Sequence, residues 1–220
     1  MDWIYVIILG YVWGSIISHW GASILLHRYY CHKQFKVPVW FETIGLAMLM
    51  IAVIRSPIGW IASHRMHHQH SDTDKDPHSW KHVGYWKVLT TTWDIPRIPI
   101  KYAKDLYENP RLVFCHMHWF KILVVVWIVS LLIGPKFFVA FALMPFIHAK
   151  IGFGLLNTIG HKEDGGSNIP WLNLLIAGEG YHKEHHKNFR RIRLHKFDTG
   201  GWISEKLMEL GIFKPTNKAV

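Results

Sequence analysis

Long apolar stretches separated by polar, aromatic-rich segments set the pattern of this chain. Residues 3–26 contain no Asp, Glu, Lys or Arg and are long enough to cross a hydrocarbon core of about 30 Å as one helix. Residues 119–133 and 137–160 form a second apolar pair, interrupted only at 134–136, which predicts a helical hairpin. We therefore expect three transmembrane helices, at about 3–26, 119–133 and 137–160.

The first predicted span carries a small side chain at every fourth position. Gly10, Gly14, Ser18 and Ala22 share one helical face and form a smooth ridge, which suits close packing against another helix. The chain opens with an acidic residue and no basic segment, and no small-residue cleavage site follows the apolar run. We interpret this stretch as a retained span and not as a signal peptide.

A shorter apolar segment lies between the first span and the hairpin. Residues 43–54 are too short for a regular span. If this segment crossed the membrane, the histidine-rich segments before and after it would lie on opposite sides. We therefore predict an interfacial helix within about 41–62, so that residues 27–118 and 161–220 share one side of the membrane.

Charge is distributed unevenly along the 220 residues, which form one predicted domain, residues 1–220. The chain carries 25 Lys and Arg against 15 Asp and Glu, a net charge of +10. Only Lys136 falls in the loop on the opposite side, so the positive-inside rule predicts a cytoplasmic location for the histidine-rich side. Segments 80–118 and 187–220 are expected to form a helical cap there. Because the basic residues flank apolar segments, nucleic-acid binding is not expected.

The expected fold is therefore an all-α integral membrane protein. It combines about three transmembrane helices and an interfacial helix with a cytoplasmic helical cap that holds a histidine-rich dimetal site. Two cysteines, Cys31 and Cys115, are too few for a disulfide framework or a cysteine-based zinc site. Any metal must be held by imidazole or oxygen.

The 17 histidines contain three groups, each next to an apolar segment. The groups are His27 and His32; His64, His67 and His68; and His182, His185 and His186. Residues four apart share a helical face, so the first and last members of each triplet should project together, with the middle one flanking them. His27 and His32, five apart, diverge on a regular helix, and we expect each to serve a different metal where the helix frays or widens. Eight imidazoles exceed what one ion can bind, so two metals are expected.

This order and spacing resembles the integral-membrane fatty acid desaturases of the acyl-CoA (stearoyl-CoA, Δ9) type. HRMHHQHSDTDKDPHS at 64–79 and GEGYHKEHH at 178–186 are most similar to boxes of that family, and the resemblance covers about residues 10–190. In that family a further histidine and a water-mediated asparagine follow the last span, and NTIGH supplies His161 and Asn157 here. The metal ligands that the resemblance implies are His27, His32, His64, His67, His68, His161, His182, His185 and His186. Asp72 and Asp76 are expected to support ligating imidazoles through their second nitrogen.

The implied reaction is the O₂-dependent introduction of a cis double bond, at Δ9, into a saturated acyl chain. Two iron ions are the expected cofactor, because only a redox metal can reduce O₂, although zinc can occupy such ligands in a purified sample. The acyl chain would be carried by CoA or by a lipid. Trp60, one turn before His64, is a candidate for the wall of the substrate tunnel.

Electrons would come from a separate ferredoxin or cytochrome b5, because the chain has no room for a fused donor domain. Lys183, Lys187, Arg190 and Arg191 are candidates for contacts with the donor or with a substrate headgroup. Such desaturases usually have four spans, so the missing span leaves the ridge of the first span open to a second copy of the chain. This predicts a possible homo-oligomer in the lipid bilayer.

Two other functions fit parts of the pattern. A membrane di-iron hydroxylase acting on a lipid, alkane or carotenoid would share the metal chemistry. A non-enzymatic metal-binding or transport protein would also use histidines, but transport calls for polar ligands along the spans, whereas these groups lie outside them.

Overall fold

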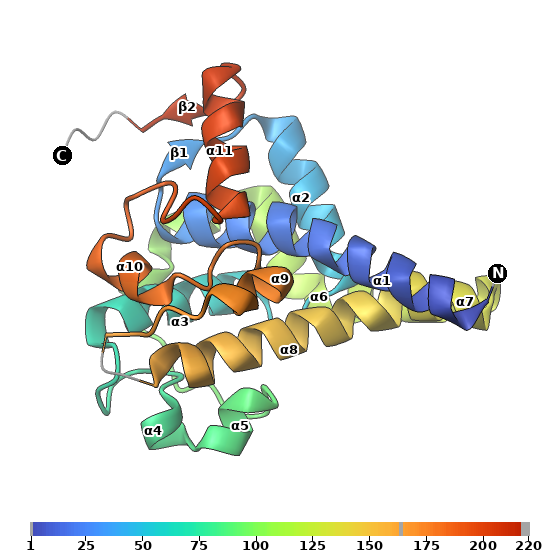
Figure 1. The fold of residues 1–220 in the computed structure, drawn as a ribbon, viewed down its shortest axis with the longest axis horizontal. Helices are drawn as coiled ribbons and strands as arrows, with labels where there is room; N and C mark the ends of the chain where they lie inside the picture. Colours follow the sequence, from blue (N-terminus) through green and yellow to red (C-terminus); the bar gives the residue numbers. More distant parts are fainter. Residues whose placement is uncertain (1, 163–164, 217–220) are drawn as a thin grey trace.

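Three long apolar helices lie side by side and taper to a common tip in the computed structural model, which describes residues 2–162 and 165–216 (Figure 1). The first runs through α1 (Trp3–Ile17) into the π-helix η1 (Ser18–Cys31). The second is α6 (Pro110–Ile133). These two helices and a third at Pro135–His161 are long and apolar enough to cross a membrane, as predicted.

The third helix turns back from the tip. It comprises α7 (Pro135–Phe138), the π-helix η4 (Val139–Leu143), α8 (Met144–Thr158) and the 3₁₀ turn η5 (Ile159–His161). The tight turn at Gly134, with φ +147°, separates it from α6. The predicted hairpin is therefore present.

The second span begins earlier than the predicted residue 119. Asn109 caps α6, because its side-chain oxygen accepts from the backbone N–H groups of Arg111 at 3.0 Å and Leu112 at 3.2 Å. Pro110 occupies the first helical position, where its missing N–H costs nothing. The first turns of α6 contain polar residues, so the apolar pattern alone places the start of this helix too late.

The segment expected to hold a single interfacial helix forms two helices. α2 (Val39–Ile51) ends at a break over 52–56, and α3 (Pro57–His70) starts at the proline. α2 packs on α6 and η1, and α3 carries the second histidine group toward η1.

The small-residue ridge of α1 faces α8 of the same chain. A Cβ on Gly10 would lie 2.6 Å from Met144 Cβ, and one on Gly14 would lie 3.1 Å from His148 Cβ. The expectation that this ridge is open to a second copy is therefore wrong, and it no longer supports a homo-oligomer.

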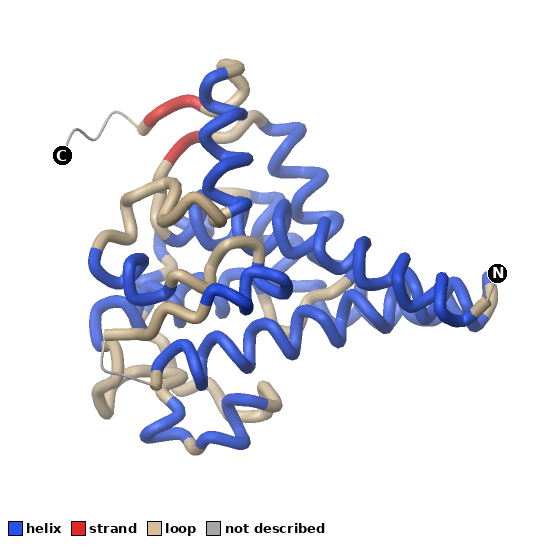
Figure 2. The backbone as a smooth tube through the Cα atoms, in the orientation of Figure 1, coloured by secondary structure: helices blue, strands red, loops and turns tan. Residues whose placement is uncertain are grey.

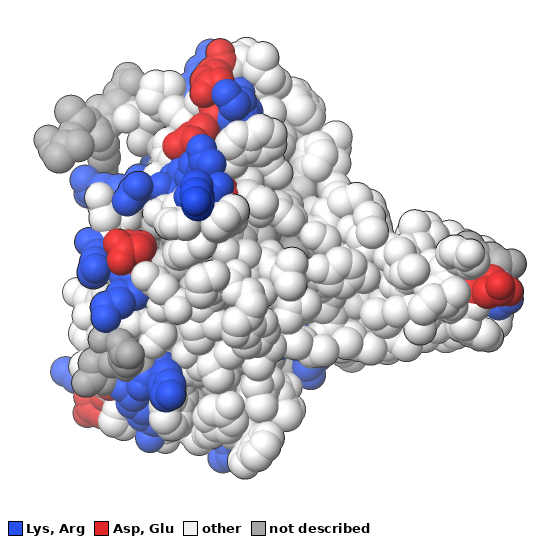
Figure 3. Space-filling view, viewed as in Figure 1, with Lys and Arg blue, Asp and Glu red and all other residues white. Residues whose placement is uncertain are grey.

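Short elements form a cap at the end of the bundle away from the tip (Figure 2). They are α4 (Trp80–Val83), α5 (Tyr85–Leu89), η2 (Ile100–Tyr102), η3 (Lys104–Glu108), η6 (Pro170–Leu172), α9 (Asn173–Ile176), α10 (His182–Lys187) and α11 (Thr199–Glu209). β1 (Phe35–Lys36) and β2 (Lys214–Pro215) pair antiparallel, with Phe35 opposite Pro215. Lys and Arg gather along the outer edge of this cap in Figure 3. At the tip, Lys136 lies over the ring of Trp3.

Candidate metal centre

The π-helical turn of η1 brings the first two histidines together. His32 donates its backbone N–H to the His27 carbonyl at 3.1 Å, an i→i+5 bond that stacks residues five apart. Their Nε2 atoms are consequently 3.1 Å apart. The helix widens as expected, but the prediction that these two residues serve different metals is wrong, because both join one cluster.

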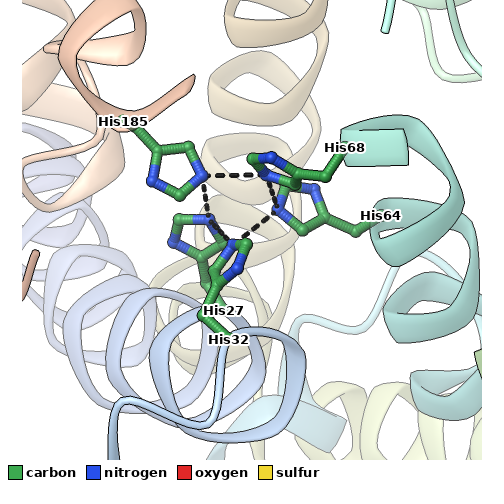
Figure 4. A group of neighbouring side chains, drawn as sticks. All are labelled: His27, His32, His64, His68 and His185. Atoms are coloured by element: carbon green, nitrogen blue, oxygen red, sulfur yellow. Dashed lines mark hydrogen bonds between the residues drawn. The ribbon is translucent and has the colours of Figure 1, made fainter. Parts of the chain in front are cut away.

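The first cluster consists of five imidazoles whose Nε2 atoms point toward a common centre (Figure 4). Its members are His27, His32, His64, His68 and His185. Neighbouring Nε2 atoms are separated by 2.9 Å (His68 and His185) to 3.2 Å (His32 and His64). Ligands at right angles around an ion with metal–nitrogen bonds of about 2.1 Å are about 3.0 Å apart. The spacing therefore fits five ligands around one ion better than a tetrahedral set.

A second cluster of four imidazoles lies next to the first. The Nε2 atom of His182 is 2.7 Å from that of His161 and 3.1 Å from that of His186. His67 completes the set, with its Nε2 3.3 Å from that of His186. The nine predicted histidines thus form two groups, each of a size suited to one metal ion.

α3 and α10 each contribute to both clusters. His64 and His68, four apart on α3, point into the first cluster, whereas His67 points into the second. α10 reverses this division, because His182 and His186 join the second cluster and His185 joins the first. The predicted i, i+4 pairing is therefore present in both helices.

Three carboxylates contact the rear nitrogens of cluster imidazoles. Asp76 Oδ2 lies 2.7 Å from Nδ1 of His67, and Asp72 Oδ1 lies 3.3 Å from Nδ1 of His161. A carboxylate at Nδ1 keeps the proton there and leaves the Nε2 lone pair for a metal. Asp72 and Asp76, which the sequence singles out, thus each lie against one imidazole of the second cluster.

The third carboxylate, Glu179, was not singled out from the sequence. Its Oε2 lies 3.0 Å from Nδ1 of His27. Burial by itself would raise the pKa of this carboxyl, but the charge of Arg28 and the contact with His27 lower it to about 2. Glu179 precedes His182 by three residues inside GEGYHKEHH, and that proximity was the available signal.

His78 also packs against the centre. Its ring stacks on His67 with centroids 4.3 Å apart, and its backbone N–H donates to Asp76 Oδ1 at 3.1 Å. His78 therefore lies behind a member of the second cluster.

Burial favours the neutral form of several cluster imidazoles. It lowers the pKa of His64, His67 and His185 well below the usual value, with the neighbouring imidazoles adding to the effect. The pKa of His186 falls to about 3 for the same reasons, burial first. Neutral imidazole is the metal-binding form, so these four side chains can bind a cation at neutral pH.

An apolar channel runs along the clusters. His27, His64 and His182 lie in its wall beside apolar residues of η1, α2, α8 and α9. Trp60, the predicted tunnel residue, lines this channel and stacks on the His64 ring with centroids 5.2 Å apart and planes at 6°. Asn157 lines it as well, and its amide nitrogen donates to the Phe153 carbonyl at 2.8 Å.

Arg55 is the charged residue at the break between α2 and α3, and it borders the channel. It donates to the Trp93 carbonyl at 2.6 Å, and its guanidinium lies 4.2 Å from the centre of the Trp93 ring. Its buried Nε has no hydrogen-bond partner among the described residues.

The predicted basic contacts lie on and after α10. Arg190 and Arg191 are exposed, and Lys187 is paired with Glu184 at 3.1 Å. Lys183 lies in the same helix, on the partly buried side.

Comparison with known proteins supports the family resemblance inferred from the sequence. The model of the fatty acid desaturase family matches residues 2–196. The sn-1 stearoyl-lipid 9-desaturase of Anabaena variabilis is 30% identical over 197 residues, covering 78% of this chain and 70% of the relative. An enzyme of the same name from Synechocystis sp. is 31% identical over 184 residues, covering 76% of this chain and 56% of the relative.

Delta-9 acyl-lipid desaturase 2 of Arabidopsis thaliana is 27% identical over 184 residues, covering 76% of this chain and 59% of the relative. This chain therefore spans 56% to 70% of the length of these three relatives. Their names describe acyl-lipid desaturases, so they support the predicted family but not its acyl-CoA type. The match of the family model over residues 2–196 and the 30% identity to a 9-desaturase show that this chain belongs to the fatty acid desaturase family, a family of oxidoreductases.

Proposed function

We propose that this protein is an acyl-lipid desaturase that introduces a cis double bond, at Δ9, into a saturated acyl chain. The observation that carries the proposal is the pair of imidazole clusters that border an apolar channel. A binding or transport protein would have no need for an apolar wall beside nine converging imidazoles.

The nine cluster histidines would hold two iron ions, and Asn157 would act through a water molecule. When bound, the two iron ions would allow O₂ to act as the oxidant. Overall, O₂, two electrons, two protons and two hydrogens from the acyl chain would give two water molecules. The residues of the chain fix this chemistry in place. Asp72, Asp76 and Glu179 hold protons on the rear nitrogens, so that the Nε2 atoms remain available.

The channel would hold the acyl chain extended and dry beside the clusters. Trp60 and Phe153 supply aromatic walls next to His64 and so restrict which methylene pair can approach. The unpartnered Nε of Arg55 is a suitable donor for a carbonyl oxygen at the polar end of the substrate. The names of the relatives favour a lipid ester over a CoA thioester as that polar end.

The clusters would face the cytoplasm. Of the 25 Lys and Arg, only Lys136 lies in the loop at the tip, while the outer edge of the cap is rich in both (Figure 3). The three long helices would span the bilayer between the cap and the tip.

A separate acidic electron carrier, such as a ferredoxin or cytochrome b5, would dock beside α10. Phe189 is exposed, and its ring lies 5.2 Å from His32 and 5.6 Å from His68, between centroids. The exposed Arg190 and Arg191 next to it would steer an acidic partner.

Reversing both charges (Arg190→Glu with Arg191→Glu) should slow reduction by a ferredoxin at least tenfold, because the basic surface would then repel the donor. Reduction by dithionite, a small molecule, should be unchanged. Equal rates of reduction by ferredoxin in the variant and the parent would contradict this docking surface.

The fatty acid profile of a desaturase-deficient host tests the function. Cells that express the parent chain should gain cis-Δ9 monounsaturated acids, and His67→Ala or His185→Ala should abolish them because each removes a member of one cluster. His70→Ala is the matched control, because this residue lies on the same α3 but outside both clusters. Pulse labelling with stearate would show whether the double bond first appears in glycerolipid, as we propose, or in acyl-CoA.

Other outcomes assign the protein differently. Hydroxylated products would identify a hydroxylase that shares the metal chemistry. An unchanged profile, with iron and a reductant system supplied, would leave a non-enzymatic metal site as the better description.

A further inference from the structure

Arg28 is a buried cation one residue after a cluster histidine. It is 1% exposed, and its guanidinium lies between two carboxylates. Nη2 donates to the two oxygens of Asp198 at 2.9 and 3.0 Å, and Nη1 pairs with Oε1 of Glu179. The remaining donors bond Ser23 and the Ile192 carbonyl. The guanidinium fork is therefore fully used.

The charges of this network do not cancel. One guanidinium against two carboxylates leaves one net negative charge in a buried site, which is costly unless a positive group faces it. The second oxygen of Glu179 lies 3.0 Å from Nδ1 of His27. The excess negative charge is thus directed at the imidazole whose other nitrogen belongs to the first cluster.

The far end of the network reaches the C-terminal helix. Asp198 is the N-cap of α11 and accepts from the backbone N–H of Gly201 at 2.7 Å and of Leu194 at 2.9 Å. The backbone makes room for it, because a Cβ on Gly178 would lie 2.1 Å from Asp198 Oδ1. An unbroken chain of contacts therefore leads from α11 through Arg28 to His27.

The second cluster has no equivalent connection in the contacts of Asp76. That carboxylate accepts from the backbone N–H groups of Asp72 at 2.9 Å and His78 at 3.1 Å, and it contacts His67 directly. A change at Arg28 should therefore act on one metal site and spare the other.

We propose that Arg28 is a positioning residue for the first metal site, which holds Glu179 against His27 and couples that site to the docking of α11. The proposal rests on the metal centre proposed above. Because coupling between two equilibria is reciprocal, a metal in the first cluster should tighten α11 against η1, and a loosened α11 should weaken that metal.

Metal titration of the full-length protein in detergent tests the proposal. Chelator-stripped parent, Arg28→Lys and Arg193→Lys would each be titrated with Co²⁺, whose visible spectrum reports the ligands around each ion. Arg193 is the matched control, because it lies in the segment just before α11 and pairs with Glu205 of that helix at 3.5 Å, not with Glu179. Arg28→Lys keeps the charge but loses the fork, so it should bind one Co²⁺ as tightly as the parent and the other at least tenfold more weakly.

Hydrogen exchange supplies a second readout that a purely structural role would not produce. In the parent and in Arg193→Lys, Co²⁺ should slow exchange of the α11 amides. In Arg28→Lys that metal-dependent protection should be lost.

The possible results separate clearly. Two equally tight sites in Arg28→Lys would overturn the proposal, and so would equal weakening of both sites together with a less stable metal-free protein. If Arg28→Lys does not fold, Asp198→Asn, which keeps the shape of the side chain but removes its charge, is judged by the same criteria. A parent that binds no Co²⁺ would remove the metal centre itself, whereas a parent with two sites and an unaffected variant would remove only the role of Arg28.

Discussion

At the scale of single residues, the carboxylates behind the imidazoles would decide which ring nitrogen meets a metal in the proposed centre. Asp76 is 3% exposed and fixed by two backbone N–H groups, so it cannot turn away from His67. Its role could be anticipated because it stands in a histidine-rich stretch that already suggested a metal site. Glu179 and Arg28 could not be paired in the same way, because 151 residues separate them along the chain.

Asp76→Asn should weaken one metal site. The amide keeps the size of the side chain but removes the negative charge behind His67, and such losses typically lower metal affinity by about 10- to 100-fold. Co²⁺ titration should show one site weakened by this factor and one unchanged. Asp74→Asn, in the exposed part of the same loop, is the control and should bind as the parent does. Equal affinities in Asp76→Asn and the parent would show that the carboxylate does not act on the metal.

At the scale of elements, helix positions followed from the sequence more reliably than helix ends. Asn109 and Pro57 are residue types that commonly mark the start of a helix, and they do so here for α6 and α3. The predicted boundaries followed the apolar residues instead and therefore missed both starts. The π-helix η1 could not be located from spacing alone, because an i→i+5 bond has no simple residue signature. Its effect on His27 and His32 therefore needed the structure.

The contact between α5 and α8 depends on a missing side chain. A Cβ on Gly154 would lie 2.0 Å from the Leu89 carbonyl oxygen, a backbone atom that cannot rotate aside. Gly154→Ala should therefore push α5 away and destabilise the protein by about 1–3 kcal/mol, seen as a lower melting temperature in detergent. Ile151→Val, on an exposed position of α8, should leave it unchanged. A melting temperature equal to that of the parent would mean that α5 does not pack so closely.

At the scale of the whole molecule, three apolar spans and a polar cap were predictable, but the partner of the glycine ridge was not. Spacing shows that Gly10 and Gly14 share a face, yet it does not show which helix meets that face. The same limit applies to the clusters: sequence spacing grouped the histidines by box, whereas the fold groups them across boxes.

The stability of the metal-free protein should fall in mild acid. Burial lowers the pKa of His64, His67, His182, His185 and His186, so the unfolded chain takes up protons below about pH 6.5 that the folded chain refuses. Each such imidazole should contribute about 1 kcal/mol of lost stability per pH unit below 6.5, continuing toward pH 3 for His186.

Scanning calorimetry on metal-free protein measures this effect. The melting temperature should be constant above about pH 7 and should fall by at least about 5 °C between pH 7.5 and 5.5. A variant with His70→Ala should behave like the parent, since this residue lies outside both clusters. A flat profile down to pH 5.5 would show that the imidazoles accept protons without cost.

Because each histidine triplet is divided between the two clusters, the helix geometry of α3 and α10 influences the distance between the clusters. On α3, His64 and His67 belong to different clusters and stand three residues apart, an axial rise of about 4.5 Å on a regular α-helix, while His67 and His68 belong to different clusters and are adjacent. On α10, His182 and His185 likewise belong to different clusters and stand three residues apart. In the proposed centre, overwinding or unwinding either helix would shift one cluster relative to the other, so the backbone of α3 and α10 would help to set the distance between the two ions.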